Sequence, residues 1–365
     1  MVIPGAVSWL IMKAPPPSTF RGAAQAANPR LRPARWWRTA CAGVQCVLCP
    51  YECFLPEGHR GICNVRQNVG GRLVTLVYAQ PVAVHVDPIE KKPVYHLYPG
   101  SRAFSISTVG CNLKCAFCQN WEISQAMPEQ ARGRWLSPAD VVEQAVAAGC
   151  RSIAYTYAEP IVFYEYVYDT AALARRRGLR NVLISGGYIN PAPLRELIPL
   201  FDIVKIDLKG FNEQFYRRIV KGELRFVLRT LEELKRAGVL TEVVNLVVPT
   251  LNDDPRDLRR MCRWIAGRLG RDTPVFFSRF TPQYRLQNLP PTPVDTLERA
   301  HAIAREAGLV YVYLGNVFGH PAEHTYCPTC QGVLIRRQGY TVLENRLTAD
   351  GTCPADGTKI PGIWT

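Results

Sequence analysis

Short apolar runs alternate with longer stretches of helical periodicity between about residues 100 and 320. Within each run the apolar residues are nearly continuous, which is typical of parallel strands that helices cover. The runs occupy 103–110, 152–157, 181–185, 202–207, 242–249 and 275–280, and a seventh follows at 310–316. The alternation predicts an α/β fold, namely a partial TIM-type (β/α)6 barrel whose missing units leave a lateral opening.

The segments between the runs carry helix start signals. The sequence SPAD puts Ser137 at an expected N-cap, with proline at the first helical position and Asp140 three residues after the cap. The sequence TPVD repeats this arrangement with Thr292, and Asp254 precedes a proline in the same way. These signals place helices between the predicted strands, as repeated β-then-α units require.

The regions outside the central part differ from it in composition. The first forty residues are rich in proline, alanine and arginine and contain no acidic residue, which predicts a disordered basic extension. Cysteines cluster on both sides of the barrel region. The predicted boundaries are 1–40 for the extension, 41–100 for a Cys-rich N-terminal module, 101–320 for the barrel and 321–365 for a C-terminal module similar to a zinc ribbon.

The charge of the chain raises the question of a nucleic-acid partner. The chain has 365 residues and a net charge of +14, with 35 arginines and 9 lysines. These positive residues are spread along the expected helix surfaces, which favours solvated helix faces over an RNA-binding surface but leaves the second reading open. No apolar run approaches the roughly 18 residues of a membrane-spanning helix, so no membrane association is predicted.

The chain contains 13 cysteines, several of them in C-x2-C clusters. In a chain of this size such clusters favour metal binding over disulfides. Metal-binding thiols must stay reduced, so we expect a cytoplasmic location.

Three of these cysteines, Cys111, Cys115 and Cys118, have the spacing C-x3-C-x2-C directly after the first predicted strand. A [4Fe–4S] cluster held by three thiolates keeps one iron without a protein ligand, and open coordination positions mark catalytic metal sites. The loop would lie at the C-terminal mouth of the barrel, where active sites of such barrels lie. The alternatives are a zinc site with a distant fourth ligand and three unrelated core cysteines.

This cysteine motif, with Phe117 before its last cysteine, resembles the signature of the radical SAM superfamily. The resemblance implies that the open iron binds S-adenosylmethionine (SAM). It further implies that one electron from the cluster cleaves SAM to methionine and a 5′-deoxyadenosyl radical, which removes a hydrogen atom from the substrate. The sixfold pattern would then be a radical SAM barrel.

Three further stretches carry the resemblance to the cofactor site. The sequence YAEP is similar to the family's G-G-E-P element, which implies that Ala158 and Glu159 lie against the methionine amino group of SAM. The sequence ISGGY contributes Ser185 and Gly186, where the backbone can approach the ligand closely. The sequence KIDLK resembles an element of the pyruvate formate-lyase activating enzymes, in which Lys209 meets the SAM carboxylate and Asp207 orders a cation or the cofactor. A simple ion pair between Asp207 and Lys209 is the alternative.

Longer segments resemble the radical SAM component of the AmmeMemoRadiSam system, which is related to the pyruvate formate-lyase activating enzymes. They are 87–100, 107–125, 245–253, 279–300 and 311–330, within a similarity that spans about 44–364. The resemblance implies AMMECR1-like and Memo-like partners, a reducing electron donor and an activating-enzyme-like reaction on a protein substrate. Radical modification of RNA or of a small metabolite remains an alternative, as does a non-catalytic zinc-binding module.

Two further cysteine sets flank the barrel. Cys46, Cys49, Cys53 and Cys63 provide four soft ligands for zinc or for an auxiliary iron–sulfur cluster, which we favour over free thiols. At the C-terminus, Cys327, Cys330 and Cys353 are joined by Asp356 at the position where a zinc ribbon has its last cysteine. Carboxylate oxygen can bind zinc, so this set is a candidate zinc site; the alternative is a ribbon held together by packing alone.

Overall fold

The computed structural model describes residues 31–131 and 133–365, and its centre is a sheet of eight strands. Seven strands run parallel in chain order from β8 to β14, and β7 pairs antiparallel with β8 at one edge. The strands are β7 (Ala83–Pro88), β8 (Arg102–Ser107), β9 (Ser152–Tyr155), β10 (Arg180–Ser185), β11 (Ile203–Asp207), β12 (Leu240–Val247), β13 (Val275–Arg279) and β14 (Val312–Gly315). Neighbouring strands in the sheet are consecutive in sequence, as β-then-α units require.

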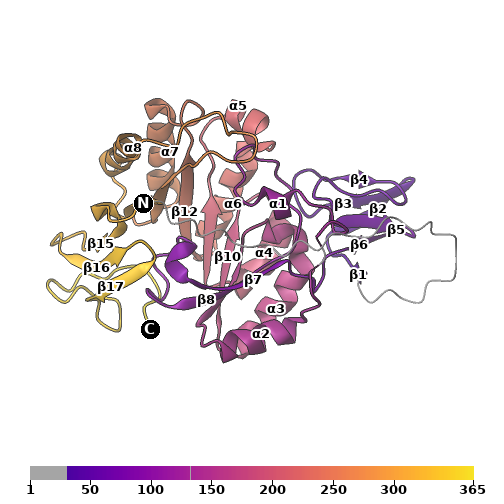
Figure 1. Cartoon of the computed structure of the whole chain (residues 1–365), viewed down its shortest axis with the longest axis horizontal. Helices are drawn as coiled ribbons and strands as arrows, with labels where there is room; N and C mark the ends of the chain where they lie inside the picture. Colours follow the sequence, from indigo (N-terminus) through magenta and orange to yellow (C-terminus); the bar gives the residue numbers. More distant parts are fainter. Residues whose placement is uncertain (1–30, 132) are drawn as a thin grey trace.

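Helices connect the successive parallel strands (Figure 1). They are α1 (Trp121–Ser124), α2 (Pro138–Ala147), α3 (Tyr164–Arg176), α4 (Pro191–Leu197), α5 (Glu213–Phe215), α6 (Leu224–Arg236), α7 (Pro255–Arg268) and α8 (Val294–Glu306). In the part of the chain that the structure describes, none of these helices has both the length and the apolar character needed to cross a membrane.

The helix start signals are confirmed at two of three places. Ser137 caps α2 in a reciprocal capping box with Asp140, and Asp254 accepts a hydrogen bond from the Arg256 N–H at the start of α7. The prediction for Thr292 is wrong, because Pro293 is the N-cap of α8. The Thr292 hydroxyl is buried and instead donates to the Val247 carbonyl at 2.6 Å, so it joins the loop before α8 to the end of β12.

The predicted α/β class is confirmed, and all seven apolar runs form strands of one parallel array. The sheet exceeds the predicted six units by β14 and by the antiparallel strand β7, which lies in the region assigned to the N-terminal module. Across the described residues the strand order runs from β14 to β7 without these two edges pairing. The sheet is therefore open, as expected for a partial barrel.

Two small groups of strands lie at opposite ends of the molecule's long axis (Figure 1). At the N-terminal side two three-stranded sheets are formed by β1 (Arg32–Pro33), β2 (Trp37–Ala40), β3 (Gly43–Cys46), β4 (Phe54–Leu55), β5 (Arg66–Val69) and β6 (Arg72–Thr75). At the C-terminal side one sheet is formed by β15 (Thr325–Tyr326), β16 (Val333–Gln338) and β17 (Thr341–Asn345).

The boundary of the predicted extension at residue 40 needs correction. Residues 31–40 contain β1 and β2, which pair with β6 and β3 and so belong to the N-terminal sheets. The rest of the predicted extension, 1–30, lies outside the described residues.

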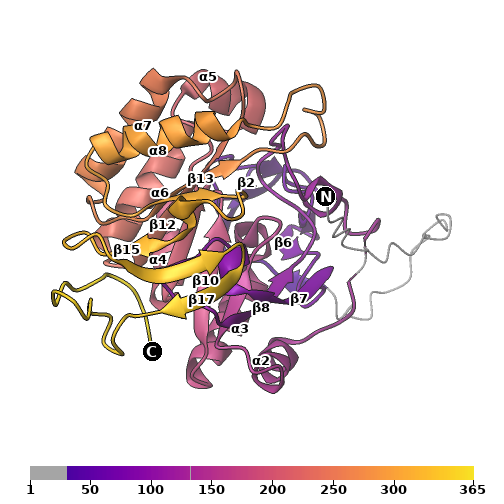
Figure 2. The same ribbon diagram turned by 60° about the vertical axis from the view of Figure 1, so that its left-hand side comes forward.

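The C-terminal sheet packs directly on the barrel, as the turned view also shows (Figure 2). Tyr95, Phe276 and Tyr313 form one apolar cluster with residues of the C-terminal module, among them Cys327 and Cys353. The buried Glu242 of β12 accepts hydrogen bonds from the Tyr95 and His96 N–H groups. The barrel and the C-terminal module thus share a core through the segment around Tyr95.

Candidate active site

A cavity of about 380 Å³ lies where the parallel strands end. Its lining includes residues from the loops after β8, β9, β10 and β11, together with residues of β12, β13 and β14. The carboxyl ends of parallel strands meet at one edge of a sheet, so groups far apart in sequence share this cavity. Of the residues predicted to form the site, the lining contains Cys111, Cys115, Phe117, Cys118, Ala158, Glu159, Gly186, Asp207 and Lys209.

The three cysteines come from the loop that follows β8. Gly110 opens this loop with a φ of 100°, and a Cβ there would lie 2.6 Å from a methyl carbon of Val65. Glycine is therefore required both for the turn and for close packing on the N-terminal module. The Leu113 N–H donates to the Cys111 sulfur at 3.3 Å, and the Cys118 sulfur lies 3.2 Å from the Ser124 hydroxyl oxygen.

Burial controls the protonation of these thiols. It raises the pKa of the Cys115 thiol to about 12, and it also raises the pKa of Cys111 well above its ordinary value. The free thiols of Cys111 and Cys115 are therefore neutral at pH 7. A metal that binds them must displace their protons, because thiolate is the ligand form of cysteine.

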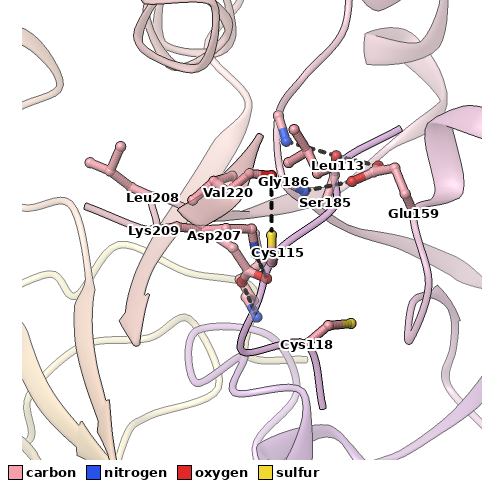
Figure 3. Close-up of polar contacts among 12 residues, drawn as sticks. Leu113, Cys115, Cys118, Glu159, Ser185, Gly186, Asp207, Leu208, Lys209 and Val220 are labelled. Carbon is pink, nitrogen blue, oxygen red and sulfur yellow. Dashed lines mark hydrogen bonds and ion pairs between the residues drawn. The ribbon is translucent and has the colours of Figure 1, made fainter. Parts of the chain in front are cut away.

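Glu159 is fixed by three donors at the ends of two strands (Figure 3). One carboxylate oxygen accepts from the Ser185 hydroxyl at 2.6 Å and from the Ile161 N–H at 3.2 Å, and the other accepts from the Gly186 N–H at 2.8 Å. Burial raises the pKa of Glu159, while these hydrogen bonds act in the opposite direction. The carboxylate is thus held in place at the cavity wall with lone pairs left for a ligand.

Ser185 and Gly186 serve this wall in different ways. Ser185 is not part of the cavity lining but supports Glu159 through its hydroxyl. A Cβ at Gly186 would lie 2.9 Å from Leu113 and 3.3 Å from the Glu159 carboxylate. Glycine at position 186 therefore allows the cysteine loop and Glu159 to pack closely against its backbone.

Asp207 lies between two lysines at the end of β11. Its carboxylate oxygens lie 2.7 Å from Lys205 Nζ and 3.3 Å from Lys209 Nζ, and the second of these pairs is drawn in Figure 3. Burial raises the pKa of Asp207, but the two ammonium groups outweigh burial and lower it to about 2. Sequence reasoning missed Lys205. The signal was present, because residues at i, i+2 and i+4 of an extended segment share one face.

Phe117 and Ala158 complete the predicted set. The Phe117 ring stacks on Phe215 with ring centroids 6.1 Å apart, and Lys209 Nζ lies 6.0 Å from the centre of the Phe117 ring. The Ala158 N–H donates to the Ser107 hydroxyl at 3.1 Å. Before it, Tyr157 adopts a φ of 65°, a conformation that glycine reaches more easily, and its hydroxyl donates to Asp87.

The sequence profile of the Radical SAM superfamily matches residues 105–264, a range that contains the three loop cysteines, Glu159, Gly186, Asp207 and Lys209. The uncharacterized protein MJ0808 of Methanocaldococcus jannaschii is 46% identical over 294 residues, which are 80% of this chain and 87% of that relative. The chain belongs to the radical SAM superfamily. A [4Fe–4S] cluster and SAM are therefore the cofactors of this radical SAM enzyme.

More distant relatives include the pyruvate formate-lyase 1-activating enzyme of Escherichia coli K12. It is 22% identical over 234 residues, which are 58% of this chain and 91% of that enzyme. Similar solved structures include TYW1 with a lysine-pyruvate adduct bound. The sequence identity is 17%, the match covers 61% of this chain and 83% of that chain, and the TM-score is 0.43. Another is a domain of a pyruvate-formate lyase-activating enzyme from Bacteroides vulgatus. The sequence identity is 12%, the match covers 45% of this chain and 99% of that chain, and the TM-score is 0.40.

This radical SAM enzyme has a compact group of ligands in its C-terminal module. The ligand atoms of Cys327, Cys330, Cys353 and Asp356 all lie within 4.8 Å of one another, with 3.8 Å between the Cys330 and Cys353 sulfurs. Tetrahedral zinc with Zn–S bonds of about 2.3 Å places its sulfurs about 3.8 Å apart. The group therefore suggests an auxiliary metal site, with the Asp356 carboxylate in the fourth position.

The structure also brings together the four N-terminal cysteines. Cys46, Cys49, Cys53 and Cys63 line one small cavity. Cys41 is exposed and does not line this cavity.

Proposed function

We propose that Cys111, Cys115 and Cys118 hold the [4Fe–4S] cluster and that SAM binds in the adjacent cavity. The observation that carries this proposal is the common cavity, in which three thiols face an ion-pair group and a fixed carboxylate. Its lining, in the described part of the chain, contains three cysteines, no fourth cysteine and no histidine. A four-iron cluster would therefore keep one iron free for a ligand that is not part of the protein.

The residues around the thiols suit the two charged ends of the methionine part of SAM. Lys209 offers an ammonium group to the carboxylate of SAM, and Glu159 offers its carboxylate to the amino group of SAM. Gly186 has no side chain, so Leu113, Glu159 and Lys209 can all approach its backbone closely at this wall. Asp207 pairs with both Lys205 and Lys209 and so holds the two ammonium groups at the cavity wall.

When bound and reduced by an external donor, the cluster would supply the one electron needed to cleave SAM to methionine and the 5′-deoxyadenosyl radical. The protein's part is to hold SAM in one orientation and to limit the access of water, so that the radical meets the substrate. Aromatic and aliphatic side chains contribute to this wall, including Phe117, Leu113 and Ile184.

A protein substrate suits the mouth of this cavity. Phe318 and Tyr340 belong to the lining, yet 64% and 37% of their surfaces are exposed, and their rings meet edge to face with centroids 5.4 Å apart. Exposed aromatic pairs beside a site are typical of protein-binding surfaces. We therefore propose a reaction like that of the activating enzymes, within the AmmeMemoRadiSam group, with AMMECR1-like and Memo-like partners and a separate electron donor.

Deuterium transfer tests this function and its alternatives. The reconstituted, reduced protein is incubated without oxygen with SAM and, in separate samples, with deuterated protein, RNA or small-metabolite pools from one organism. We expect deuterium in 5′-deoxyadenosine from the protein pool. Label from RNA or metabolites alone would contradict the protein-substrate proposal, and the absence of 5′-deoxyadenosine in every sample would contradict the site itself.

A further inference from the structure

We propose that Cys46, Cys49, Cys53 and Cys63 bind a second [4Fe–4S] cluster, one whose four irons all have protein ligands. The four ligands of this site are different residues from Cys111, Cys115 and Cys118. Full ligation leaves no position for SAM or substrate, so the chemistry of this second cluster is limited to accepting and passing on single electrons.

The quartet of cysteines, defined as these four residues, surrounds one enclosed space. All four line a cavity of about 20 Å³, together with Gly61, Arg66 and Asn112. Among the residues that the structure describes, the lining contains no histidine and no acidic residue. Thiolate is therefore the available ligand, and such a set selects zinc or iron–sulfur clusters over harder cations.

The distances between the cysteine sulfurs distinguish a zinc ion from an iron–sulfur cluster as the occupant. In the described ranges 31–131 and 133–365, the only group of three or more candidate ligands within 4.8 Å of one another is the C-terminal one. The quartet does not meet this spacing, and neither does the set Cys111, Cys115 and Cys118. One zinc ion needs sulfurs about 3.8 Å apart, whereas in a four-iron cluster each thiolate binds a different iron. The wider quartet therefore fits a cluster.

The packing at Gly61 and the hydrogen-bond capacity of Arg66 agree with this occupant. A Cβ at Gly61 would lie 3.6 Å from the Cys53 sulfur and 3.8 Å from the Cys63 sulfur, so glycine leaves room between these two ligands. Arg66 is 1% exposed and pairs with Glu165, but its Nε–H has no hydrogen-bond partner within the described structure. Donors near cluster sulfurs stabilise the added negative charge of the reduced state.

The quartet and the cysteine loop are immediate neighbours. Asn112 lines the quartet cavity, while Cys111 and Leu113 on either side of it line the active-site cavity. Gly110 packs against the carbonyl oxygen of Cys63, which a Cβ would approach to 2.8 Å. One short stretch of backbone therefore separates the two sites.

Metal analysis of the full chain tests the proposal. Parent, Cys46→Ser/Cys63→Ser and Cys111→Ala/Cys115→Ala/Cys118→Ala proteins are reconstituted without oxygen in the presence of iron, sulfide and zinc. We expect about eight irons and one zinc in the parent, and about four irons in each variant. Cys41→Ser is the matched control, because Cys41 is an exposed cysteine of the same region, and its metal content should equal that of the parent.

Electron paramagnetic resonance separates this proposal from the proposed function. In the triple variant the reduced signal should persist and be unchanged by SAM. Four irons in the parent, none in the triple variant and a second zinc in both would overturn the second cluster. A SAM-dependent signal in the triple variant would overturn the assignment of SAM to the cysteine loop instead. The triple variant leaves the quartet intact, so it decides the question even where the double variant fails to fold.

Discussion

The cysteine loop and the C-terminal ligand group each contribute three cysteines, but they differ in spacing and surroundings. The candidate ligand atoms of the C-terminal group lie within 4.8 Å of one another, and Asp356 offers a carboxylate oxygen as the fourth of them. The thiols of the loop instead lie around a cavity of about 380 Å³ that also contains Glu159 and Lys209. The two sets therefore differ as a compact ligand group differs from thiols that line a cavity with room for another molecule.

The surroundings of the two sets differ as much as their spacing. Beside the loop, Asp207 and two lysines form a charged group in a largely buried setting, which is costly unless it serves a ligand or is fully paired. The C-terminal group lies in a small β-sheet module that shares an apolar core with the barrel. The predictions below test whether the two regions are as different in function as in structure.

The largest effect is expected from removal of a loop thiol. Cys115→Ala should lower the release of 5′-deoxyadenosine by more than the roughly 100-fold that loss of an outer-shell partner costs, because a direct cluster ligand is lost. The measurement is anaerobic product analysis with a strong reductant. Cys41→Ala, which removes an exposed thiol, should behave as the parent does. Equal SAM cleavage by the Cys115 variant and the parent would contradict the site.

The next largest effect is expected from a change in the charged group of Asp207, Lys205 and Lys209. Asp207→Asn leaves Lys205 and Lys209 without their carboxylate, and we expect SAM to bind about tenfold more weakly, with a loss of stability of about 1–3 kcal/mol. Equilibrium binding and thermal unfolding measure the two changes. Glu143→Gln, which breaks an exposed ion pair with Arg177, is the matched control. It should change neither the affinity for SAM nor the melting temperature by much. Unchanged SAM affinity in the Asp207 variant would show that this group is only structural.

The C-terminal group should affect stability more than chemistry. Cys330→Ala should lose the zinc and lower the melting temperature by about 5 °C, while SAM cleavage stays within about twofold of the parent. Asp356→Cys should bind zinc more tightly than the parent, because it completes a set of four thiolates. If the Cys330 variant lost SAM cleavage while zinc stayed bound, the claim that the C-terminal group serves stability and the cysteine loop serves SAM cleavage would be contradicted.

The smallest effect concerns the junction between the barrel and the C-terminal module. Burial raises the pKa of Glu242 to about 7, above the value of about 4.3 expected in the unfolded chain. The folded state therefore retains a proton that the unfolded state loses, and stability should fall as the pH rises from about 4 to 7. Glu242→Gln should flatten this dependence, with a difference of about 3 °C in melting temperature across the range. An unchanged slope in the variant would contradict this role.

Sequence patterns predicted the barrel because its strands are nearly continuous apolar runs. Strand β7 escaped this reasoning, since Val84 and Val86 are exposed on an edge strand and alternate with other residues. Thr292 resembled a helix cap, yet the strand end beside it offered its hydroxyl a buried carbonyl partner. Whether such a hydroxyl caps the helix or bonds to a neighbouring strand depends on tertiary contacts, which a local sequence pattern does not contain.

The site was predictable where each group directly follows a strand. The three loop cysteines, Glu159 and Lys209 meet in one cavity because parallel strands end at one edge. The supporting contacts were not predictable in the same way. The hydrogen bond from Ser185 to Glu159 and the position of Lys205 depend on how neighbouring strands are placed side by side.

The most direct measurement is the electron paramagnetic resonance spectrum of the reduced, oxygen-free protein before and after addition of SAM. If Cys111, Cys115 and Cys118 hold a four-iron cluster with one accessible iron, SAM should change the signal of the parent, and Cys115→Ala should abolish that change. Identical spectra with and without SAM, or an identical SAM-dependent change in the variant, would contradict the account.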